Sequence, residues 1–559
     1  MKILPEELKA ILLKSGFIQE KDIDAAVKTA AQVDRSLTDI LIFRGLITDE
    51  ALSQLVAEYY KVPYISLHNK TIDPAILDTI SENMARSYRM IPFEKDGTSL
   101  KVAMEDPKDF EAVEQARRRT RLKIVPHLAS SNEIAKALGQ YKRNIKQVFE
   151  QIIAENLKKA SKSGEDLARI AQDLPVIKIL ETLLQYAIAE GASDIHIESL
   201  ENSVVIRFRI DGILHDIISM PRQLQKAIVA RIKILSNLKI DEHRIPQDGR
   251  FKFQVDEEIV SARVSIIPAF YDENVTLRML LESTRPLPLE ELGLTGKNAA
   301  IISENLKKSY GMMLITGPTG SGKSTTLYSI LNILNSPEVN IWTLEDPIEY
   351  GINRVNQAQM NPVTGFTFAA GLRALLRHDP NVIMVGEIRD NETAEMAIQS
   401  ALTGHLVLST LHTNSAAGAI PRFLDMGAEG FLVASTVNVV IAQRLVRKIC
   451  TSCIEKYKPT DLELTLFKEK FAARIQKQEF YRGKGCQECG GRGYKGRVGI
   501  YEVLASSPAI SELTLKRAST EAIEQQALKE GMVSMLEDGL DKISAGSTTV
   551  EEVLRAVRE

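Results

Sequence analysis

Apolar runs in the C-terminal half of the chain have the length expected of buried β-strands. They are "GMMLITG" (311–317), "NIWTLED" (340–346), "NVIMVGE" (381–387) and "HLVLSTL" (405–411). The chain between successive runs is long enough for helical crossovers. Parallel sheets covered by helices show this pattern, because both faces of their strands are buried. We therefore expect an α/β domain over residues 291–559, with a helical region at 505–559.

A different pattern precedes this domain, in which apolar and polar residues alternate as in half-buried strands. A helix is expected at "PVIKILETLLQYAIAEGAS" (175–193), and a strand at "NSVVIRFRI" (202–210) is followed by Asp211 and Gly212. Asp-Gly pairs favour the two-residue type I′ hairpin turn. We expect a compact α+β domain over residues 176–290.

The N-terminal part contains an internal repeat, and a polar segment follows it. Each copy, 13–27 and 42–56, has the pattern of a helix end, a glycine cap and the acidic first turn of another helix. The predicted first domain, 1–140, combines a helical repeat at 1–60 with an α+β half at 61–140. The segment that follows, 141–175, is polar and Lys-rich and is interpreted as a linker with helical pieces.

Length, charge and the lengths of the apolar runs limit the classes of protein to which the chain can belong. The chain has 559 residues, and at about 150 residues per domain this length suggests three or four domains. The formal charge of -3 gives no general reason to expect nucleic acid or an anionic membrane as partner. No uncharged apolar run reaches the ~18 residues of a membrane span, and the first residues lack the apolar segment of a secretory signal. We expect a cytoplasmic protein that reaches a membrane only through partners.

A glycine-rich stretch lies between a predicted strand and a predicted helix and matches the pattern G-x-x-x-x-G-K-[ST]. In such phosphate-binding loops, glycines let backbone N–H groups surround phosphate oxygens at a helix N-terminus. We expect Lys323 to contact the β- and γ-phosphates of ATP and Ser324 to bind Mg²⁺. The expected nucleotide-binding residues are Gly317, Pro318, Thr319, Gly320, Ser321, Gly322, Lys323, Ser324 and Thr325.

Acidic side chains and a histidine follow the neighbouring strands. Glu345 and Asp346 end one predicted strand, and Glu387 ends another. Phosphate binds at the carboxyl ends of parallel strands, so these carboxylates should face the phosphates and the metal. Carboxylates at such a place either orient the attacking water or hold hydrated Mg²⁺. His405 and His412 lie at opposite ends of a further strand, which puts only His412 at this edge.

The two histidines therefore receive different interpretations. A histidine within an apolar run is more often structural than catalytic, and His405 keeps that structural interpretation. His412 is expected to contact the nucleotide. A metal site shared by both is disfavoured, because a strand of this length holds its ends about 20 Å apart.

All four cysteines lie in one short segment, as two C-x₂-C pairs. This clustering argues for a metal and against disulfides. Four thiolates suit a tetrahedral, structural Zn²⁺ site with no open position for catalysis. The alternative is a set of reduced, unpaired thiols. The predicted ligands, in an arm at 450–490, are Cys450, Cys453, Cys486 and Cys489.

These motifs resemble those of the secretion and pilus-assembly ATPases of bacterial type II secretion and type IV pilus systems. The shared segments are the phosphate-binding loop, "TLEDPIEY" (343–350), "LRALLRHDPNVIMVGEIRD" (372–390), "TGHLVLSTLHTNSA" (403–416) and the two cysteine pairs. The resemblance implies that Glu345 is the general base and that Glu387 holds Mg²⁺ through water. It also implies that His412 contacts the nucleotide.

The same resemblance implies a multidomain α/β architecture, in which a PAS-like α+β domain precedes a RecA-like, parallel-sheet ATPase domain. The family is hexameric, and its arginines reach the nucleotide across subunits. Without the resemblance, arginines on a sheet are equally well explained as ordinary surface charges. A guanidinium group is nevertheless suited to bind the phosphates of a neighbouring rigid unit. The matching positions are Arg263, Arg278, Arg373, Arg377 and Arg389.

The N-terminal repeat resembles the module that binds cyclic di-GMP in some of these ATPases, but it departs from that pattern. There each copy carries Arg-Leu-Gly before the repeat's glycine and ends in glutamine. Here "ELK" (7–9) and "SLT" (36–38) occupy the first places, and Tyr59 replaces a glutamine. Without the guanidinium and the close-approach glycine, little is left to hold guanine or phosphate. We expect no cyclic di-GMP binding and favour docking to an inner-membrane platform protein.

The resemblance implies a cytoplasmic, homohexameric, Mg²⁺-dependent ATPase, peripheral at the inner membrane, that powers extension of a type IV pilus or assembly of a type II secretion pseudopilus. Its partners would be the cytoplasmic domain of a platform protein and the pilus or secretion components. A DNA-uptake pseudopilus is an alternative output, because those machines share the motor. A retraction motor is disfavoured, since such motors usually lack the cysteine arm and the long N-terminal region.

Two further classes are less well supported. A RecA-like nucleic-acid translocase needs a basic channel bearing aromatic residues, whereas this chain has 6% aromatics and no basic blocks near the motor. Direct nucleic-acid binding is therefore not expected. A scaffold that binds ATP without turnover is disfavoured by the intact Lys323, Glu345 and Glu387.

Overall fold

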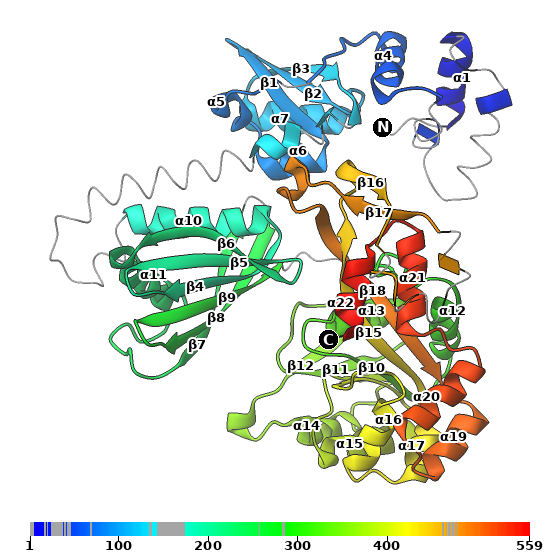
Figure 1. Ribbon diagram of the computed structural model, residues 1–559. Helices are drawn as coiled ribbons and strands as arrows, with labels where there is room; N and C mark the ends of the chain where they lie inside the picture. The colour runs from blue at the N-terminus through cyan, green and yellow to red at the C-terminus, as the bar shows by residue number, and fades with distance from the viewer. Residues whose placement is uncertain are drawn as a thin grey trace. The chain divides into compact units, whose positions relative to one another are not determined.

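The structure, a computed structural model, divides into two compact units (Figure 1). One consists mainly of Met1–Glu258 and Ala262–Met279, and the other mainly of Leu280–Gly485 and Arg492–Glu559. The residues that the structure describes are 5–15, 18, 21–23, 37–38, 41, 46–67, 70–131, 133–134, 137–141, 174–255, 258–281, 286–460, 463–465, 467, 471, 474–475 and 478–558. The linker residues 142–173 and the SLT motif's Ser36 lie outside this part of the chain.

The N-terminal helices belong to the repeat, and a small α+β fold follows them. Thr48 caps α4 by accepting a hydrogen bond from the backbone N–H of Ala51, and acidic residues occupy the first turn as expected. Strands β1, β2 and β3 form a three-stranded sheet in the predicted α+β half at 61–140, in which β1 and β2 are antiparallel and β2 and β3 are parallel. The elements are α1 (Pro5–Ser15), α4 (Asp49–Tyr60), α5 (Pro74–Leu77), α6 (Glu82–Ser87), β1 (Met90–Asp96), β2 (Ser99–Met104), α7 (Phe110–Thr120) and β3 (Lys123–Leu128).

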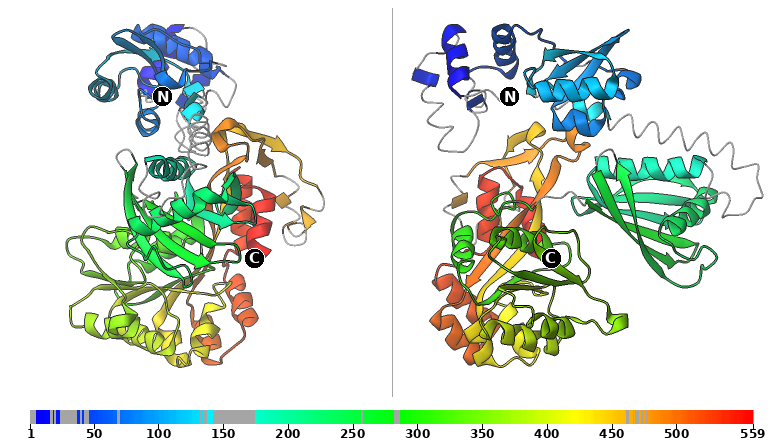
Figure 2. Two further views of the ribbon diagram at one scale, coloured as in Figure 1. Left: turned by 90° about the vertical axis from the view of Figure 1, so that its left-hand side faces the viewer. Right: turned by 180° about the vertical axis from the view of Figure 1, so that it is seen from behind.

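An α+β domain with a six-stranded sheet completes the first unit, with strand order β6-β5-β4-β9-β8-β7. Both central residues of the predicted hairpin turn, Asp211 and Gly212, have positive φ, which is the type I′ geometry. Helices α10 and α11 pack on the sheet through a shared apolar core (Figure 2). The elements are α10 (Leu174–Ala189), β4 (Ala192–Ser199), β5 (Ser203–Ile210), β6 (Ile213–Pro221), α11 (Arg222–Leu235), β7 (Gln247–Val255), β8 (Glu258–Pro268) and β9 (Glu273–Leu281).

The second unit is built on a seven-stranded sheet, ordered β12-β11-β13-β14-β10-β15-β18. The predicted parallel sheet is confirmed: the four predicted strands are β10, β11, β13 and β14, and β12 and β15 add two parallel strands that were not predicted. The last strand, β18, runs antiparallel to β15 and was not anticipated. The strands are β10 (Gly311–Thr316), β11 (Ile341–Glu345), β12 (Val355–Gln359), β13 (Val382–Val385), β14 (Leu406–Leu411), β15 (Val437–Ile449) and β18 (Tyr494–Ala505).

Helices cover both faces of this sheet, so alternate residues of a central strand enter different cores. On β10, Met312 and Leu314 pack into one core, while Met313 and Ile315 pack into the core that includes α13. The helices are α12 (Gly296–Asn305), α13 (Lys323–Leu334), α14 (Phe368–Leu375), α15 (Asn391–Leu402), α16 (Ala419–Asp425), α17 (Gly430–Thr436), α19 (Pro508–Leu515), α20 (Thr520–Lys529), α21 (Met535–Ser544) and α22 (Val550–Arg558).

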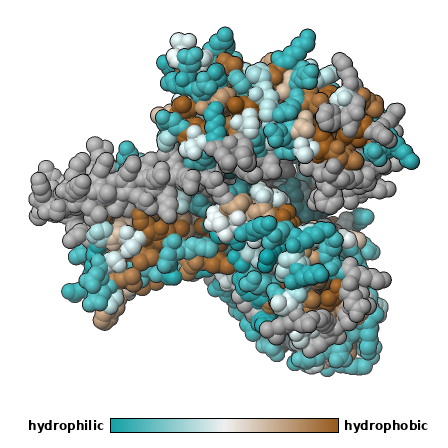
Figure 3. All heavy atoms as spheres, turned by 45° about the horizontal axis from the view of Figure 1, so that its top comes forward, coloured by the Kyte–Doolittle hydropathy of each residue, from teal (hydrophilic) through white to brown (hydrophobic). Residues whose placement is uncertain are grey.

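The cysteine-bearing arm leaves the sheet after β15. It contains the antiparallel pair β16 (Ile454–Tyr457) and β17 (Phe480–Gly483), flanked by the short 3₁₀ turns Thr451–Cys453 and Gln487–Cys489. Hydrophilic and hydrophobic side chains are interspersed on the molecular face drawn in Figure 3. Within the described residues, we find no helix with both the length and the apolar character needed to cross a membrane.

Candidate nucleotide-binding and metal sites

The glycine-rich loop connects the end of β10 to the start of α13 at Lys323, as the motif predicts. Gly317 and Gly322 have φ of 147° and 88°, a region that residues with a Cβ rarely adopt. A Cβ at Gly317 would lie 2.5 Å from the Gln443 carbonyl oxygen, and one at Gly322 would lie 2.8 Å from Nε2 of Gln443. Conformation therefore requires glycine at both positions, and at Gly317 the contact with a backbone atom leaves no space for a Cβ.

The Lys323 ammonium folds back onto this loop. Its Nζ donates hydrogen bonds to the carbonyl oxygens of Gly317 at 2.8 Å and Pro318 at 3.0 Å. Burial lowers the pKa of Lys323, the charge of Glu387 opposes that shift, and the charge of Arg444 adds to it. A cation that is partly buried beside another cation favours an anion such as phosphate at this position.

Glu345 is a buried carboxylate held by several hydrogen-bond donors. It ends β11 with 4% of its surface exposed. The Tyr328 hydroxyl donates to Oε2, while the Thr343 hydroxyl donates to Oε1 at 2.6 Å and the Gln357 amide donates to Oε1 at 3.0 Å. Three donors from α13, β11 and β12 thus fix the orientation of one buried carboxylate.

Glu387 and His412 meet beyond the carboxyl ends of β13 and β14. Nε2 of His412 lies 3.4 Å from Oε2 of Glu387, and Nε of Arg389 lies 2.7 Å from the same oxygen. The charge of Glu387 also acts on Lys323. Glu387 after β13, the histidine segment (residues 403–416) and the phosphate-binding loop therefore lie close together, as expected for the carboxyl edge of a parallel sheet.

The strand β14 separates the two histidines of the histidine segment. His405 precedes it, and its Nδ1 lies 2.9 Å from the Ser400 carbonyl oxygen and 3.2 Å from the Thr403 hydroxyl oxygen. At the other end, the backbone N–H of Thr413 donates to the Thr316 hydroxyl oxygen at 2.8 Å. This bond ties the segment containing His412 to the end of β10, directly before the phosphate-binding loop.

The remaining residues of the predicted site lie around these groups. Ser324 and Thr325 are exposed in the first turn of α13, where a hydroxyl can reach a metal ion at the phosphates. Thr319 and Gly320 are exposed at the tip of the loop, and Ser321 is buried.

The five predicted intersubunit arginines are distributed over both units. Arg263 lies on β8 and Arg278 on β9, where Nε of Arg278 is 2.9 Å from Oδ1 of Asp194. In the second unit, Arg373 pairs with Glu392, and Arg377 donates to the Arg373 carbonyl oxygen at 3.1 Å. The side chains of Arg278, Arg373 and Arg389 are 56%, 57% and 71% exposed, which leaves guanidinium donors accessible.

Sequence reasoning missed several polar residues that support the site. Tyr328, Thr343 and Gln357 hold Glu345, whereas Gln443 and Arg444 flank the phosphate-binding loop from β15. One signal was present for Tyr328, because a tyrosine on the apolar face of a buried helix needs a partner for its hydroxyl. The others carried no local signal, since their partners are distant in the chain.

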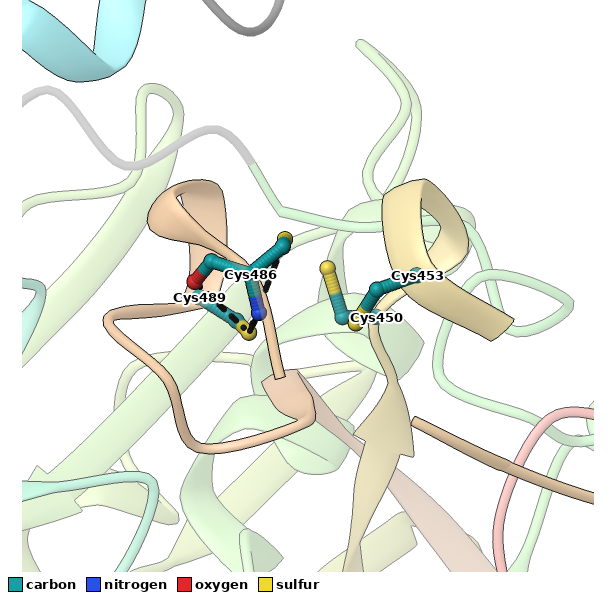
Figure 4. Close-up of side chains that lie close together, drawn as sticks. All are labelled: Cys450, Cys453, Cys486 and Cys489. Atoms are coloured by element: carbon teal, nitrogen blue, oxygen red, sulfur yellow. Dashed lines mark hydrogen bonds between the residues drawn. The ribbon is translucent and has the colours of Figure 1, made fainter. Parts of the chain in front are cut away.

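The four cysteines gather between the two turns of the arm (Figure 4). Their sulfur atoms all lie within 4.8 Å of one another, and Sγ of Cys486 is 3.7 Å from Sγ of Cys489. Zn–S bonds of about 2.3 Å in a tetrahedron place sulfur atoms about 3.8 Å apart. Cys450 and Cys489 are buried, and no disulfide joins the four. The donor set and its spacing therefore fit a structural zinc ion.

Comparisons with known proteins assign the chain to a family. A family model described as Type II/IV secretion system protein matches residues 169–555, which include every motif of the second unit. The chain belongs to this family. A second model, the MshEN domain, matches residues 60–148. The expected family is confirmed, and together with relatives named as ATPases it identifies the chain as an ATP-hydrolysing motor.

Two curated relatives show how far the similarity extends. The chain is 38% identical over 554 residues to the type IV pilus assembly ATPase PilB of Myxococcus xanthus, with 98% of each chain covered. It is 46% identical over 396 residues to the type II secretion system ATPase E of Vibrio cholerae, covering 71% of this chain and 78% of that one.

A solved structure agrees with the fold of the same region. The ATPase DotB of Yersinia pseudotuberculosis aligns with a TM-score of 0.51 at 21% identity, covering 68% of this chain and 94% of that structure. At this identity the likeness establishes shared fold, and the chemistry rests on the residues of the site.

Proposed function

We propose that this chain hydrolyses ATP to power extension of a type IV pilus or assembly of a type II secretion pseudopilus. The observation that carries the proposal is the convergence of Lys323, Glu387 and His412 at one edge of the sheet, with a clamped Glu345 on a neighbouring strand. The family membership and the names of the two relatives, a pilus assembly ATPase and a secretion ATPase, support the output.

The site residues divide the work of phosphoryl transfer. The loop from Gly317 to Thr325 wraps the phosphates of ATP, and Lys323 exchanges its bonds to loop carbonyl oxygens for phosphate oxygens. Ser324 and, through water, Glu387 would hold Mg²⁺, which neutralises phosphate charge when bound. Glu345 orients the attacking water as general base. His412 contacts the nucleotide and links its state to Glu387.

Nucleotide binding is proposed to act between subunits of a homohexamer. Arg263 and Arg278 come from the α+β domain, proposed to be PAS-like and to span 176–290. Arg373, Arg377 and Arg389 come from the RecA-like domain, proposed at 291–559. A guanidinium from one subunit that binds phosphate of another favours a closed arrangement while ATP is present. Hydrolysis would weaken that contact, and the resulting movement would do work on a partner.

The arm and the N-terminal module are assigned to stability and attachment. The thiolates of the four cysteines would hold Zn²⁺, which links the two turns of the arm where no disulfide does. The module at 1–140 would dock to the cytoplasmic domain of an inner-membrane platform protein, so that the motor is cytoplasmic and reaches the membrane through that partner. Direct binding of nucleic acid or cyclic di-GMP forms no part of the proposal.

Two measurements test the proposal. Purified protein should release phosphate from ATP only with Mg²⁺, and DNA should not stimulate that release. A strain lacking the protein should lose surface pili or secreted substrates, and the wild-type gene should restore them while Glu345→Gln does not. Full pilus assembly and secretion in the deletion strain would contradict the proposed output. Stimulation by DNA would favour the translocase alternative.

A further inference from the structure

Tyr328 lies in the core beneath the candidate active site. It is 1% exposed on α13, and its hydroxyl donates to Oε2 of Glu345. The same hydroxyl oxygen accepts from the backbone N–H of Glu349 at 3.3 Å, which fixes the direction of donation. Burial raises the pKa of Tyr328, and the charge of Glu345 raises it further, so the hydroxyl keeps its proton at neutral pH.

The donors around Glu345 leave its two oxygens unequal. A carboxylate offers about four acceptor positions, two on each oxygen. On Oε1, the Thr343 hydroxyl and the Gln357 amide fill both positions. On Oε2, Tyr328 fills one. The position that remains for a water molecule is therefore on the oxygen that Tyr328 orients.

A rigid element also connects this hydroxyl to the phosphate-binding loop. The helix α13 begins at Lys323 and carries Tyr328 in its second turn. The Tyr350 ring packs edge-on against the Tyr328 ring, with centroids 4.7 Å apart, and restricts its rotation. The helix that holds Oε2 in place through Tyr328 is therefore the same helix whose N-terminus should bind the phosphates.

We propose that Tyr328 is a positioning residue for ATP hydrolysis, which holds Oε2 of Glu345 where it accepts a hydrogen bond from the attacking water. The inference rests on the proposed role of Glu345 as general base. Tyr328 does not touch the nucleotide and acts only through the carboxylate. Misplacement of a catalytic group by about 1 Å can cost up to about 100-fold in rate.

The test compares purified full-length variants in steady-state ATP hydrolysis. Tyr328→Phe removes the hydroxyl and keeps the ring, and it should lower kcat about 10-fold or more while KM stays within about twofold of wild type. Tyr350→Phe is the matched control, since it removes a neighbouring hydroxyl that is not among the donors to Glu345 and keeps the edge-on packing. Its kcat should equal that of wild type.

A double variant separates positioning from a general structural role. If Tyr328 acts through Glu345, adding Tyr328→Phe to Glu345→Gln should lower kcat no further, because residues that act as a unit are not additive. A further 10-fold loss in the double variant would overturn the proposal, and so would wild-type kcat in Tyr328→Phe. If Tyr328→Phe does not fold, Tyr328→Met replaces it, since it also removes the hydroxyl and its flexible apolar side chain can fill the space of the ring.

The same data distinguish failure of this inference from failure of the proposed function. Wild-type turnover in Glu345→Gln would overturn the role of Glu345 and the positioning role together. A nearly inactive Glu345→Gln beside a fully active Tyr328→Phe would overturn the positioning role alone.

Discussion

Nε2 of His412 lies 3.4 Å from Oε2 of Glu387. The two residues follow different strands, β14 and β13, and Arg389 contacts the same carboxylate oxygen at 2.7 Å. A side chain that contacts both the nucleotide and this carboxylate can report the nucleotide's state to the residue proposed to hold Mg²⁺. We therefore expect this pair to link ATP binding to hydrolysis.

His412→Ala should uncouple ATP binding from ATP hydrolysis. We expect ATP binding to change by less than about threefold, while kcat falls about 10-fold or more, because a transition-state contact is lost and ground-state binding is kept. Nucleotide affinity measured beside steady-state hydrolysis tests this. His405→Ala is the matched control at the other end of β14, where the ring contacts Ser400 and Thr403. Equal loss of kcat in both variants would show that the two histidines have been wrongly distinguished.

Glu345→Gln should preserve ATP binding and abolish most turnover. The amide keeps the size of the side chain but cannot act as a general base, and we expect kcat to fall by about 100-fold or more. Phosphate release and nucleotide affinity, measured on the same preparation, separate the two effects. Glu338→Gln serves as control, since Glu338 is an exposed carboxylate just beyond α13. Turnover at the wild-type rate in Glu345→Gln would contradict the assignment of the base.

Local sequence patterns predicted those parts of the fold and the site that depend on a single strand, helix or turn and its ends. The loop motif predicted the end of β10 and the start of α13 at Lys323, and strand direction alone separated His412 from His405. The turn at Asp211 was equally local, because an Asp-Gly pair adopts positive φ at little cost. These features follow from short-range sterics and from the shared polarity of parallel strands.

Features that depend on pairing between distant segments could not be predicted. Strand β18 follows the cysteine arm and pairs with β15 by returning along the sheet edge, and no pattern within either strand specifies that partner. The contact of Tyr328 with Glu345 likewise joins a helix to a neighbouring strand. Strand β1 was missed because its second half is polar and exposed, which weakens the alternation that marks a strand.

Loss of one cysteine should abolish zinc binding and leave the nucleotide pocket formed. Cys453→Ser replaces a thiolate by a neutral hydroxyl, so we expect zinc per chain to fall from about one to near zero. Nucleotide affinity should stay within about twofold, while the arm becomes more susceptible to protease. Ser452→Ala, an exposed neighbour in the same turn, is the control and should retain the metal. Undiminished zinc in Cys453→Ser would contradict the four-thiolate site.

A buried ion pair in the α+β domain supplies a test of stability. Nζ of Lys233 lies 2.7 Å from Oε1 of Glu273, and the two side chains are 1% and 5% exposed. Lys233→Met should lower the free energy of unfolding by about 3–5 kcal/mol, because Glu273 would keep a buried charge without its main partner. Chemical denaturation monitored on the α+β domain's transition measures this. Lys226→Met, on an exposed site of α11, should change it by less than about 1 kcal/mol. Adding Glu273→Met to Lys233→Met should recover most of the loss, since replacing both charges removes the unpaired carboxylate. No recovery in the double variant would show that packing around Lys233, and not the charge pair, stabilises this domain.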